Sequence, residues 1–391
     1  MFIRRFHQTL IDANNISIYL HWPFCESKCP YCDFNSHVRE KVVQDEWLQG
    51  YLKNIRLWVS IFPNPKIKTV YFGGGTPSLM EPNIVSDLLE GLDKYYSIAN
   101  NIEISLEANP SSVEIKKFRD YASAGINRIS IGVQSFVDKD LRLLGRRHSA
   151  KEALSAVEIG TNIFENLSFD LIYGRQFQSL LDWEQELQFA ISLRSQHLSL
   201  YQLTVENNTA FGKLFDKGKL KGLPSDELSR KLFMTTNDIC YSNGYKPYEI
   251  SNFALDKQEC KHNVNYWKCG NFLGIGPGAH GRYQLNQKRF SYESIKNPET
   301  WLNKSFNEDL AINVKKRMSD LDHFEEFVIM GLRLSEGLSL SKMQKNFGKR
   351  FDEKILQELI SLGFIEIASN QLKVLQKGKV LLNYITKELL T

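Results

Sequence analysis

Three cysteines near the amino terminus, Cys25, Cys29 and Cys32, are the residues of this 391-residue chain that point most directly to chemistry. They are spaced C-x3-C-x2-C and follow an apolar run that begins at Ile16. Closely spaced thiolates are the usual ligands of iron–sulfur clusters, whereas a structural zinc site normally takes four ligands, often from paired C-x2-C units. Three thiolates leave the fourth iron of a cubane cluster open. We therefore expect an iron–sulfur centre at a reactive site.

A glycine-rich stretch, Gly73-Gly74-Gly75-Thr76-Pro77, ends the next apolar, β-rich run. Glycine lets the backbone approach a ligand closely, although a tight turn is the simpler interpretation of three glycines alone. The pattern is not a Walker loop, because no Lys-Ser/Thr follows, and it is not G-x-G-x-x-G. Beside an open-iron cluster, it indicates a loop that receives a small polar ligand.

Four polar side chains lie in or just after further apolar runs, namely Glu107, Gln134, Arg146 and Asp170. Any one of them could be an ordinary surface residue at the end of a strand. Polar groups that point into a barrel cost free energy unless a partner satisfies them. Together they favour a ligand with amino, carboxylate and ribose groups, and Arg146 is the candidate partner of the carboxylate.

Six β-rich runs alternate with helical patterns, and they begin at Ile16, Lys68, Asn101, Arg128, Leu167 and His197. Regular βα alternation predicts an α/β fold with a parallel sheet and right-handed crossovers. Six units are too few for the closed eight-stranded barrel, so we expect a partial, three-quarter (β/α)6 barrel. Chemistry in such barrels lies at the carboxyl ends of the strands, which is where the candidate residues would lie.

We expect three parts: a barrel core at 1–212, an extension at 213–318 and a C-terminal domain at 319–391. The core ends where the chain becomes rich in Gly and Lys, after Lys213. Beyond about Asp320, three helical patterns and a hairpin predict a winged-helix-like α+β domain. Its candidate recognition helix, at 352–363, carries one lysine against three acidic residues. Because phosphate contact needs basic side chains, no nucleic-acid partner is expected.

The composition, with 42% apolar and 24% charged residues, is that of an ordinary soluble globular protein. No run of about 18 apolar residues predicts a membrane span, and the first ten residues lack the apolar core of a secretory signal. The net charge of +4 does not by itself predict binding to nucleic acid or membranes. The six cysteines form no disulfide framework. We therefore expect a cytoplasmic protein.

Taken together, these motifs resemble the radical S-adenosylmethionine superfamily, and the runs beginning at Asn127, Leu144 and Asp170 resemble its oxygen-independent coproporphyrinogen III oxidase branch. The resemblance implies a radical S-adenosylmethionine barrel with a [4Fe–4S] cluster on Cys25, Cys29 and Cys32. S-adenosylmethionine would bind the open iron through its amino and carboxylate groups. The resemblance places these residues around it: Tyr19, Gly74, Gly75, Thr76, Glu107, Gln134, Arg146 and Asp170.

Within this branch, the chain is most similar to the HemW group of haem chaperones. The oxidases carry a further cysteine two positions after the third, where this chain has Phe34, and a longer arm than the 18 residues that precede Tyr19 here. The four residues His262, Asn263, Tyr266 and Trp267 resemble the H-N-x-x-Y-W haem motif of that group. An imidazole can ligate haem iron, and aromatic rings can cover the macrocycle. On the sequence alone, a hydrogen-bonded histidine cluster is the simpler interpretation of that motif.

The resemblance therefore implies haem as a ligand and haem-requiring respiratory proteins as acceptors, and it allows for transient contact with membrane proteins. An oxygen-independent coproporphyrinogen III oxidase is the alternative, followed by a cluster-sensing regulator that binds DNA. The chain departs from its relatives at Arg175-Gln176, where Leu-Pro is usual, which puts the shape of that loop in doubt. No oligomeric state is predicted.

Overall fold

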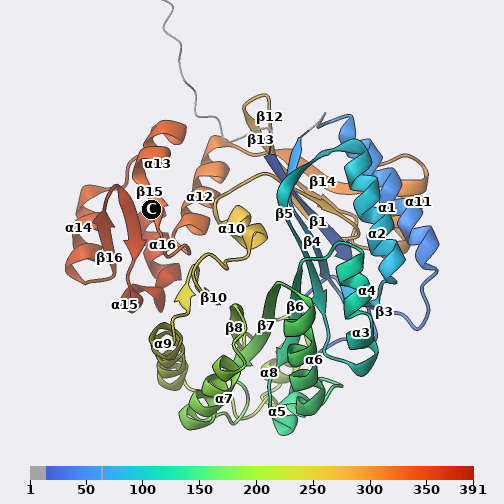
Figure 1. Cartoon of the computed structure of the whole chain (residues 1–391). Coiled ribbons are helices and arrows are strands. Elements are labelled where there is room, and N and C mark those ends of the chain that lie inside the picture. Colours follow the sequence, from blue (N-terminus) through green and yellow to red (C-terminus); the bar gives the residue numbers. More distant parts are fainter. Residues whose placement is uncertain (1–14, 63–64) are drawn as a thin grey trace, which may run out of the picture.

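A twelve-stranded sheet runs through most of the chain, of which the computed structural model describes residues 15–62 and 65–391. Its six central strands are parallel, neighbour one another in chain order and curve into a partial barrel (Figure 1). They are β1 (Asn15–Trp22), β4 (Lys66–Gly74), β5 (Ser97–Ala108), β6 (Arg128–Gln134), β7 (Asn166–Tyr173) and β8 (His197–Gln202). The prediction of a partial (β/α)6 barrel is confirmed.

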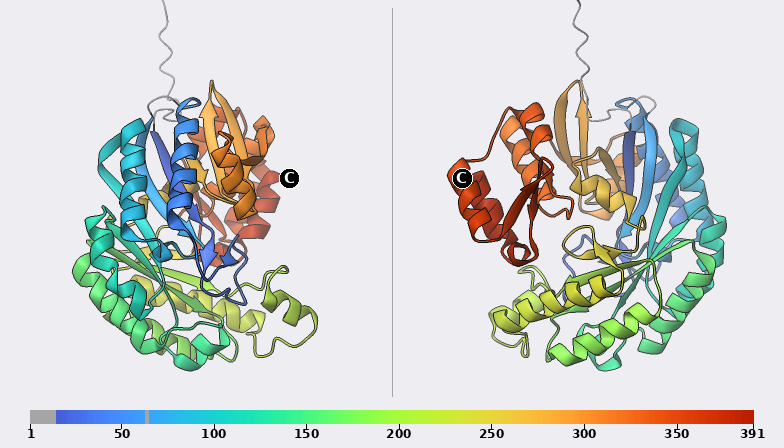
Figure 2. Two further views of the ribbon diagram at one scale, coloured as in Figure 1. Left: turned by 90° about the vertical axis from the view of Figure 1, so that its right-hand side faces the viewer. Right: turned by 60° about the vertical axis from the view of Figure 1, so that its left-hand side comes forward.

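Helices between these strands cover the outer face of the curved sheet (Figure 2). They are α1 (Gln44–Val59), α2 (Pro82–Tyr95), α3 (Ser112–Lys116), α4 (Phe118–Ser123), α5 (Asp138–Leu143), α6 (Ala150–Ile163) and α7 (Leu180–Ser192). Capping boxes at Ser149 and Ser179 satisfy backbone N–H groups at the starts of α6 and α7.

The barrel strands are apolar on their outer face and polar on their inner face. Ile18 of β1 and Val70 of β4 are fully buried in the core beneath the helices. Because side chains alternate along a strand, the residues between the apolar ones point to the inner side. These are Ser17, Tyr19, Thr69, Tyr71, Glu103, Ser105, Glu107, Arg128, Ser130, Ser168, Asp170, His197, Ser199 and Tyr201. A parallel sheet buried on both faces normally reads as continuous apolar runs, so this interior is built for polar contents.

The segment predicted as an extension adds strands to both edges of the sheet. Strand β11 (Phe272–Ile275) lies parallel to β1, and β12 (His280–Leu285), β13 (Lys288–Ser294) and β14 (Ile312–Arg317) follow it as an antiparallel meander. On the other side, β10 (Asn252–Ala254) and β9 (Lys246–Pro247) extend β8. The helices of this segment are α8 (Ala210–Asp216), α9 (Asp226–Ser242), α10 (Lys261–Trp267) and α11 (Pro298–Phe306). The sequence analysis did not foresee these strands, because they are short and mix apolar with charged residues.

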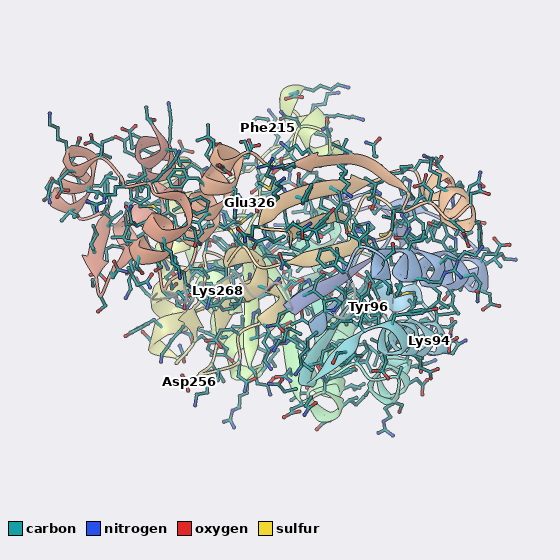
Figure 3. The ribbon with its side chains drawn as sticks, turned by 90° about the horizontal axis from the view of Figure 1, so that it is seen from above. Lys94, Tyr96, Phe215, Asp256, Lys268 and Glu326 are labelled. Atoms are coloured by element: carbon teal, nitrogen blue, oxygen red, sulfur yellow. The ribbon has the colours of Figure 1, made fainter. Side chains whose placement is uncertain are left out.

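The C-terminal domain has its own apolar core and a three-stranded sheet. Its elements are α12 (Asp320–Gly331), β15 (Leu338–Ser339), α13 (Leu340–Phe347), α14 (Glu353–Ser361), β16 (Ile365–Ala368), β17 (Gln371–Val374), α15 (Gln376–Lys379) and α16 (Leu382–Leu390). The first three of these helices and the β16–β17 hairpin match the predicted winged-helix-like pattern, and α15 and α16 follow them. Glu326 of α12 joins the domain to the sheet, because it accepts hydrogen bonds from Arg282 at 2.7 Å and Arg289 at 3.3 Å (Figure 3).

Two expectations fall partly or wholly on residues that the structure does not describe. The short arm before Tyr19 and the absence of a secretory signal concern residues 1–14, which lie outside the described part. Within residues 15–62 and 65–391, no helix combines the length and apolar character that a membrane crossing requires.

Candidate functional site

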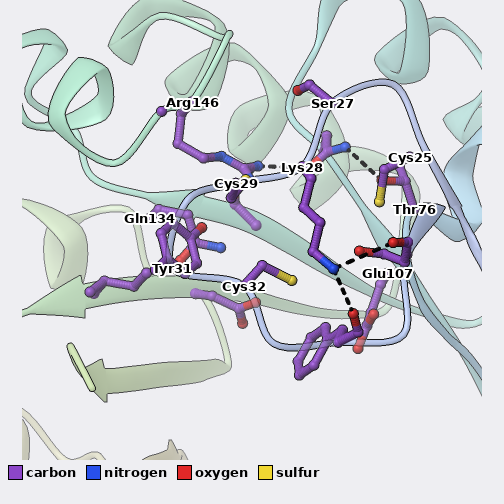
Figure 4. A pocket seen from close by; sticks show the side chains of 18 of the residues that line it. Cys25, Ser27, Lys28, Cys29, Tyr31, Cys32, Thr76, Glu107, Gln134 and Arg146 are labelled. Atoms are coloured by element: carbon purple, nitrogen blue, oxygen red, sulfur yellow. Dashed lines mark hydrogen bonds between the residues drawn. The ribbon is translucent and has the colours of Figure 1, made fainter. Parts of the chain in front are cut away.

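The three cysteines lie on a loop that leaves the carboxyl end of β1. The loop runs from β2 (Phe24–Cys25) to β3 (His37–Val38), and these two short strands pair with each other. Nζ of Lys28 donates to the carbonyl oxygens of Phe34 at 3.2 Å and Ser36 at 3.5 Å, which closes the loop upon itself. The three thiols therefore face one cavity at this end of the barrel (Figure 4).

This cavity has a volume of about 520 Å³ and gathers most of the predicted site residues. Those that line it are Cys25, Cys29, Cys32, Gly74, Gly75, Thr76, Glu107, Gln134, Arg146 and Asp170. They come from five of the six parallel strands or from the loops that follow them, as expected for the carboxyl end of such a barrel. Tyr19 and the four residues of the predicted haem motif are not among the lining residues.

The thiols suit an iron–sulfur cluster better than a single ion. Among the described residues, no three His, Cys, Asp or Glu side chains converge as the ligands of one metal ion do. In a cubane cluster each thiolate instead binds a different iron. Oγ1 of Thr76 donates to Sγ of Cys25 at 3.3 Å, and Nη1 of Arg146 donates to Sγ of Cys29 at 3.3 Å. Burial raises the pKa of Cys25 and Cys32, so bound iron would have to take the place of their protons.

The glycines at the end of β4 are required by close packing against β1 and the start of the cysteine loop. Gly74 has a φ of 112°, and a Cβ there would lie 2.6 Å from Cε1 of His21. A Cβ on Gly75 would lie 2.6 Å from the carbonyl oxygen of Phe24. The backbone N–H of Gly74 donates to Oε2 of Glu107 at 3.3 Å. This stretch thus forms a closely packed part of the cavity wall, where side chains on the two glycines would not fit.

Two partly buried carboxyl groups, those of Glu107 and Asp170, line the same cavity as the cysteines. Glu107 accepts a hydrogen bond from the hydroxyl of Tyr71 at 2.9 Å, and Asp170 accepts one from Ser130 at 3.4 Å. Burial raises the pKa of Glu107 to about 7 and that of Asp170 to about 6. A cationic ligand such as a sulfonium with an ammonium group would favour their ionised forms. The pair therefore suits a positively charged occupant of the cavity.

The unusual Arg175 is buried outside the cavity and holds the loop after β6. Its Nη2 bonds to Glu186 and lies 2.9 Å from Oδ2 of Asp140, and its Nη1 lies 3.4 Å from the carbonyl oxygen of Gln134. Glu186 in turn accepts the backbone N–H of Phe136 at 2.8 Å. Gln134 has a φ of 67°, a strained value for a residue with a side chain. The departure at Arg175 thus fixes the backbone that carries the Gln134 amide.

Tyr19 lies on the inner face of β1, deeper than the cysteine loop. Its hydroxyl lies 3.2 Å from Nδ1 of His21, and its ring stacks on Tyr71 with centroids 6.1 Å apart. Burial raises its pKa well above the usual value, followed by repulsion from Glu107. Tyr19 therefore lies next to the Tyr71–Glu107 pair rather than against the cavity.

The predicted haem motif lies on α10, which plugs the other end of the barrel interior. The carboxylate of Glu103 accepts the backbone N–H groups of Lys261 at 3.1 Å and His262 at 3.0 Å, and pairs with Arg128 at 3.0 Å. The ring of His262 stacks on Tyr71, with centroids 4.9 Å apart. The structure therefore connects the motif to the inner face of the barrel.

The four motif residues do not all point the same way. His262 is buried, with its ring nitrogens bonded to Thr69 and Tyr266. Nδ2 of Asn263 donates to the hydroxyl of Tyr248 at 3.4 Å. Trp267 packs beneath the guanidinium of Arg333, which lies 4.7 Å from the ring centroid and comes from the C-terminal domain. The motif thus links the barrel interior to that domain.

Several residues of the site were missed by the sequence analysis. Tyr71, Asn109, Ser130 and Tyr201 surround the predicted residues, and Asn35 ties the cysteine loop to the carbonyl oxygen of Pro277 at 2.9 Å. The polar alternation along β4, β6 and β8 could have identified the three strand residues. No sequence signal joins Asn35 to Pro277, because their contact spans 242 positions.

Comparison with known proteins agrees with this geometry. Residues 19–190 match the Radical SAM superfamily, and residues 318–381 match the HemN C-terminal domain. The coproporphyrinogen III oxidase HemN of Escherichia coli, a radical SAM enzyme, has a TM-score of 0.82 at 21% identity, covering 97% of this chain and 90% of that one. At this identity the match shows a common fold. Fold and site together define a radical S-adenosylmethionine protein.

Relatives of higher sequence identity show which family of radical S-adenosylmethionine proteins the chain belongs to. The heme chaperone HemW of Escherichia coli strain K12 is 34% identical over 378 residues, covering 96% of this chain and 98% of that protein. The mitochondrial radical S-adenosyl methionine domain-containing protein 1 of Dictyostelium discoideum is 36% identical over 423 residues, with 96% and 94% covered. The chain belongs to the HemW family.

Proposed function

We propose that this protein is a haem chaperone that binds a [4Fe–4S] cluster, S-adenosylmethionine and haem, and passes haem to haem-requiring respiratory proteins. The observation that carries this proposal is the site of Phe34. Phe34 is 58% exposed at the rim of the three-cysteine cavity, at the position where the oxidases that the chain resembles have a fourth cysteine. The names of the HemW relatives support the same assignment.

Different residues of the cavity would bind the cluster and S-adenosylmethionine. Cys25, Cys29 and Cys32 would hold the cluster, which supplies single electrons when it is reduced. The Gly74–Thr76 backbone, Arg146 and the carboxyl groups of Glu107 and Asp170 would hold S-adenosylmethionine, with Gln134 beside it. Tyr19 would act on this ligand through Tyr71 and Glu107, since it does not line the cavity.

Haem would be bound by the motif residues His262, Asn263, Tyr266 and Trp267. The first three lie among hydrogen bonds of the barrel interior, and Trp267 lies against the C-terminal domain. In the proposed organisation, the core at 1–212 carries the cluster and the extension at 213–318 carries the haem motif, with the domain at 319–391 beside it. We propose the cytoplasm as the compartment, because the cluster thiolates need reducing conditions.

A haem titration tests the proposal. Reconstituted protein should take up haem with a shifted Soret band, and His262→Ala combined with Trp267→Ala should weaken that binding. Unchanged binding in the double variant would remove the haem motif from the proposal. Cys240→Ala serves as the control, because Cys240 belongs to the apolar core on α9 and neither lines the cavity nor forms part of the haem motif.

The second candidate, a coproporphyrinogen III oxidase, is favoured by the fold that the chain has in common with HemN and by the match of residues 318–381 to the HemN C-terminal domain. Anaerobic incubation with coproporphyrinogen III, S-adenosylmethionine and a reductant separates the two. Formation of protoporphyrinogen would make the oxidase the main function. A DNA-binding regulator predicts salt-dependent retention on DNA, and we expect none.

A further inference from the structure

A hydrogen-bonded chain of side chains joins Cys25 to Cys29 along the cavity wall. At one end Thr76 donates to the sulfur of Cys25, and at the other Arg146 donates to the sulfur of Cys29, both at 3.3 Å (Figure 4). Asn109 connects them. Its Nδ2 donates to Oγ1 of Thr76 at 3.4 Å, and its Oδ1 accepts from Nη2 of Arg146 at 2.7 Å.

The chemistry of the middle position calls for a primary amide. Thr76 has one hydroxyl proton, which it donates to Cys25, so the side chain next to it at position 109 must be a donor. Arg146 has only donors, so its partner must accept. An amide side chain does both, whereas an aspartate can only accept. Asn109 therefore lets both ends of the chain direct a donor at a sulfur.

The backbone around Asn109 is fixed by contacts of its own. Its N–H donates to Oε2 of the buried Glu114 at 2.9 Å, and the next residue is Pro110, which restricts the main chain. Arg146 is held a second time by the carbonyl oxygen of Gly132 at 3.0 Å. The chain of donors is thus part of a rigid wall and not a set of free surface side chains.

We propose that Asn109 is a positioning residue that sets the reduction potential of the cluster by aiming Thr76 and Arg146 at two of its sulfur ligands. Hydrogen bonds to the sulfurs and nearby positive charge stabilise the more negative, reduced cluster. The inference rests on the cluster assigned under the proposed function. It adds a role for Arg146 besides contact with a ligand carboxylate.

The test is the potential of the reconstituted cluster in full-length protein without S-adenosylmethionine, followed by the electron paramagnetic resonance signal of its reduced form. Asn109→Ala should shift the potential to more negative values. Asn109→Asp should shift it further, because it loses the donor to Thr76 and adds an anion. Thr204→Ala is the matched control. Thr204 lines the same cavity but takes no part in the hydrogen bonds of Thr76, Asn109 and Arg146, so the cluster of this variant should keep the wild-type potential.

Two further variants distinguish a role of Asn109 in positioning the two donors from a general disruption of the fold or of cluster binding. In an Arg146→Met background, Asn109→Ala should shift the potential less than it does alone, because one of the donors it aims is already gone. A wild-type potential in Asn109→Ala overturns the proposal. Should that variant lose its cluster, Thr76→Val removes the donor to Cys25 together with the acceptor of the Asn109 amide, and an unchanged potential there overturns the proposal equally. If the wild type itself binds no [4Fe–4S] cluster, it is the proposed function that fails.

Discussion

Nδ1 of His262 lies 2.7 Å from Oγ1 of Thr69, on the inner face of the barrel. The other ring nitrogen lies 2.8 Å from the hydroxyl of Tyr266. Burial lowers the pKa of His262 to about 3, so the imidazole is neutral at any physiological pH. A neutral imidazole is the form that binds iron, but both of its nitrogens are engaged here. Since the Thr69 hydroxyl donates to Oγ of Ser17 at 2.8 Å, it accepts from Nδ1, and ligation of haem by Nε2 of His262 requires the bond to Tyr266 to break.

This relationship predicts that Thr69→Val weakens haem binding. The Thr69 hydroxyl donates to Oγ of Ser17, so it accepts the Nδ1–H of His262 and holds the imidazole in the tautomer whose Nε2 can bind iron. Losing this neutral hydrogen bond costs about 1 kcal/mol, or about a fivefold higher Kd. Soret titration of reconstituted protein measures the change. Thr161→Ala, on the outer helix α6, is the control and should leave the Kd as it is. If His262→Ala binds haem as tightly as the wild type, the histidine is not the ligand and the prediction fails with it.

Binding of S-adenosylmethionine should weaken as the pH falls through 7 and then through 6. Burial holds the pKa of Glu107 at about 7 and that of Asp170 at about 6, and the cationic ligand favours the ionised carboxylates. Below each pKa, binding must displace a proton, so each group weakens affinity by up to about tenfold per pH unit. Equilibrium dialysis between pH 5.5 and 8 measures the Kd.

Glu107→Gln provides the control for the pH dependence. The variant should bind less tightly at pH 8 and lose the step near pH 7, while the step near pH 6 remains. A Kd that is constant over the whole range in the wild type would contradict the electrostatic role of these carboxyl groups. In the ligand-free protein, the raised pKa of Glu107 makes the fold less stable as the pH rises from about 4.5 to about 7.

The buried Arg175 should support ligand binding through Gln134. Arg175→Leu removes the contact to the Gln134 carbonyl and leaves Glu186 without its cation, so we expect a lower Tm and about tenfold weaker binding of S-adenosylmethionine. In a Gln134→Ala background, the same substitution should lower the Tm again but weaken binding no further.

The control for this pair is Arg119→Leu, an exposed arginine on α4, which should change neither quantity. Arg175→Lys keeps the charge without the fork of donors, and partial recovery of affinity is expected. Fully additive losses of affinity in the double variant would show that Arg175 supports the fold in general and not the Gln134 backbone.

Removing one partner of the buried ion pair of Arg128 with Glu103 should strongly destabilise the protein. Both side chains are buried, and Arg128→Met leaves the Glu103 carboxylate without its cation, which costs about 3–5 kcal/mol. Urea unfolding measures the loss. Lys231→Met removes the cation of an exposed pair on α9 and should change stability little. Adding Glu103→Gln to Arg128→Met should recover part of the loss, and equal losses in both would argue against an unpaired buried charge.

Most of the correct predictions from the sequence came from patterns of residues that are close together in the chain. The spacing of Cys25, Cys29 and Cys32 indicated the cluster, and the βα alternation indicated the open parallel barrel. The carboxyl ends of parallel strands all lie at one edge of the sheet. Glu107, Gln134 and Asp170 were therefore correctly expected to meet there. These inferences need only local periodicity and one rule of topology.

Tertiary structure alone decided the contacts between distant segments. The bonds of Asn109 to Thr76 and Arg146, of His262 to Thr69, and of Asn35 to Pro277 join residues from different strands and loops. It also showed that α10 enters the barrel and that the extension continues the sheet at both edges. Such pairings depend on how whole elements pack. A polar side chain within an apolar run indicates that it will need a hydrogen-bond partner, but only the packed structure determines which residue that partner is.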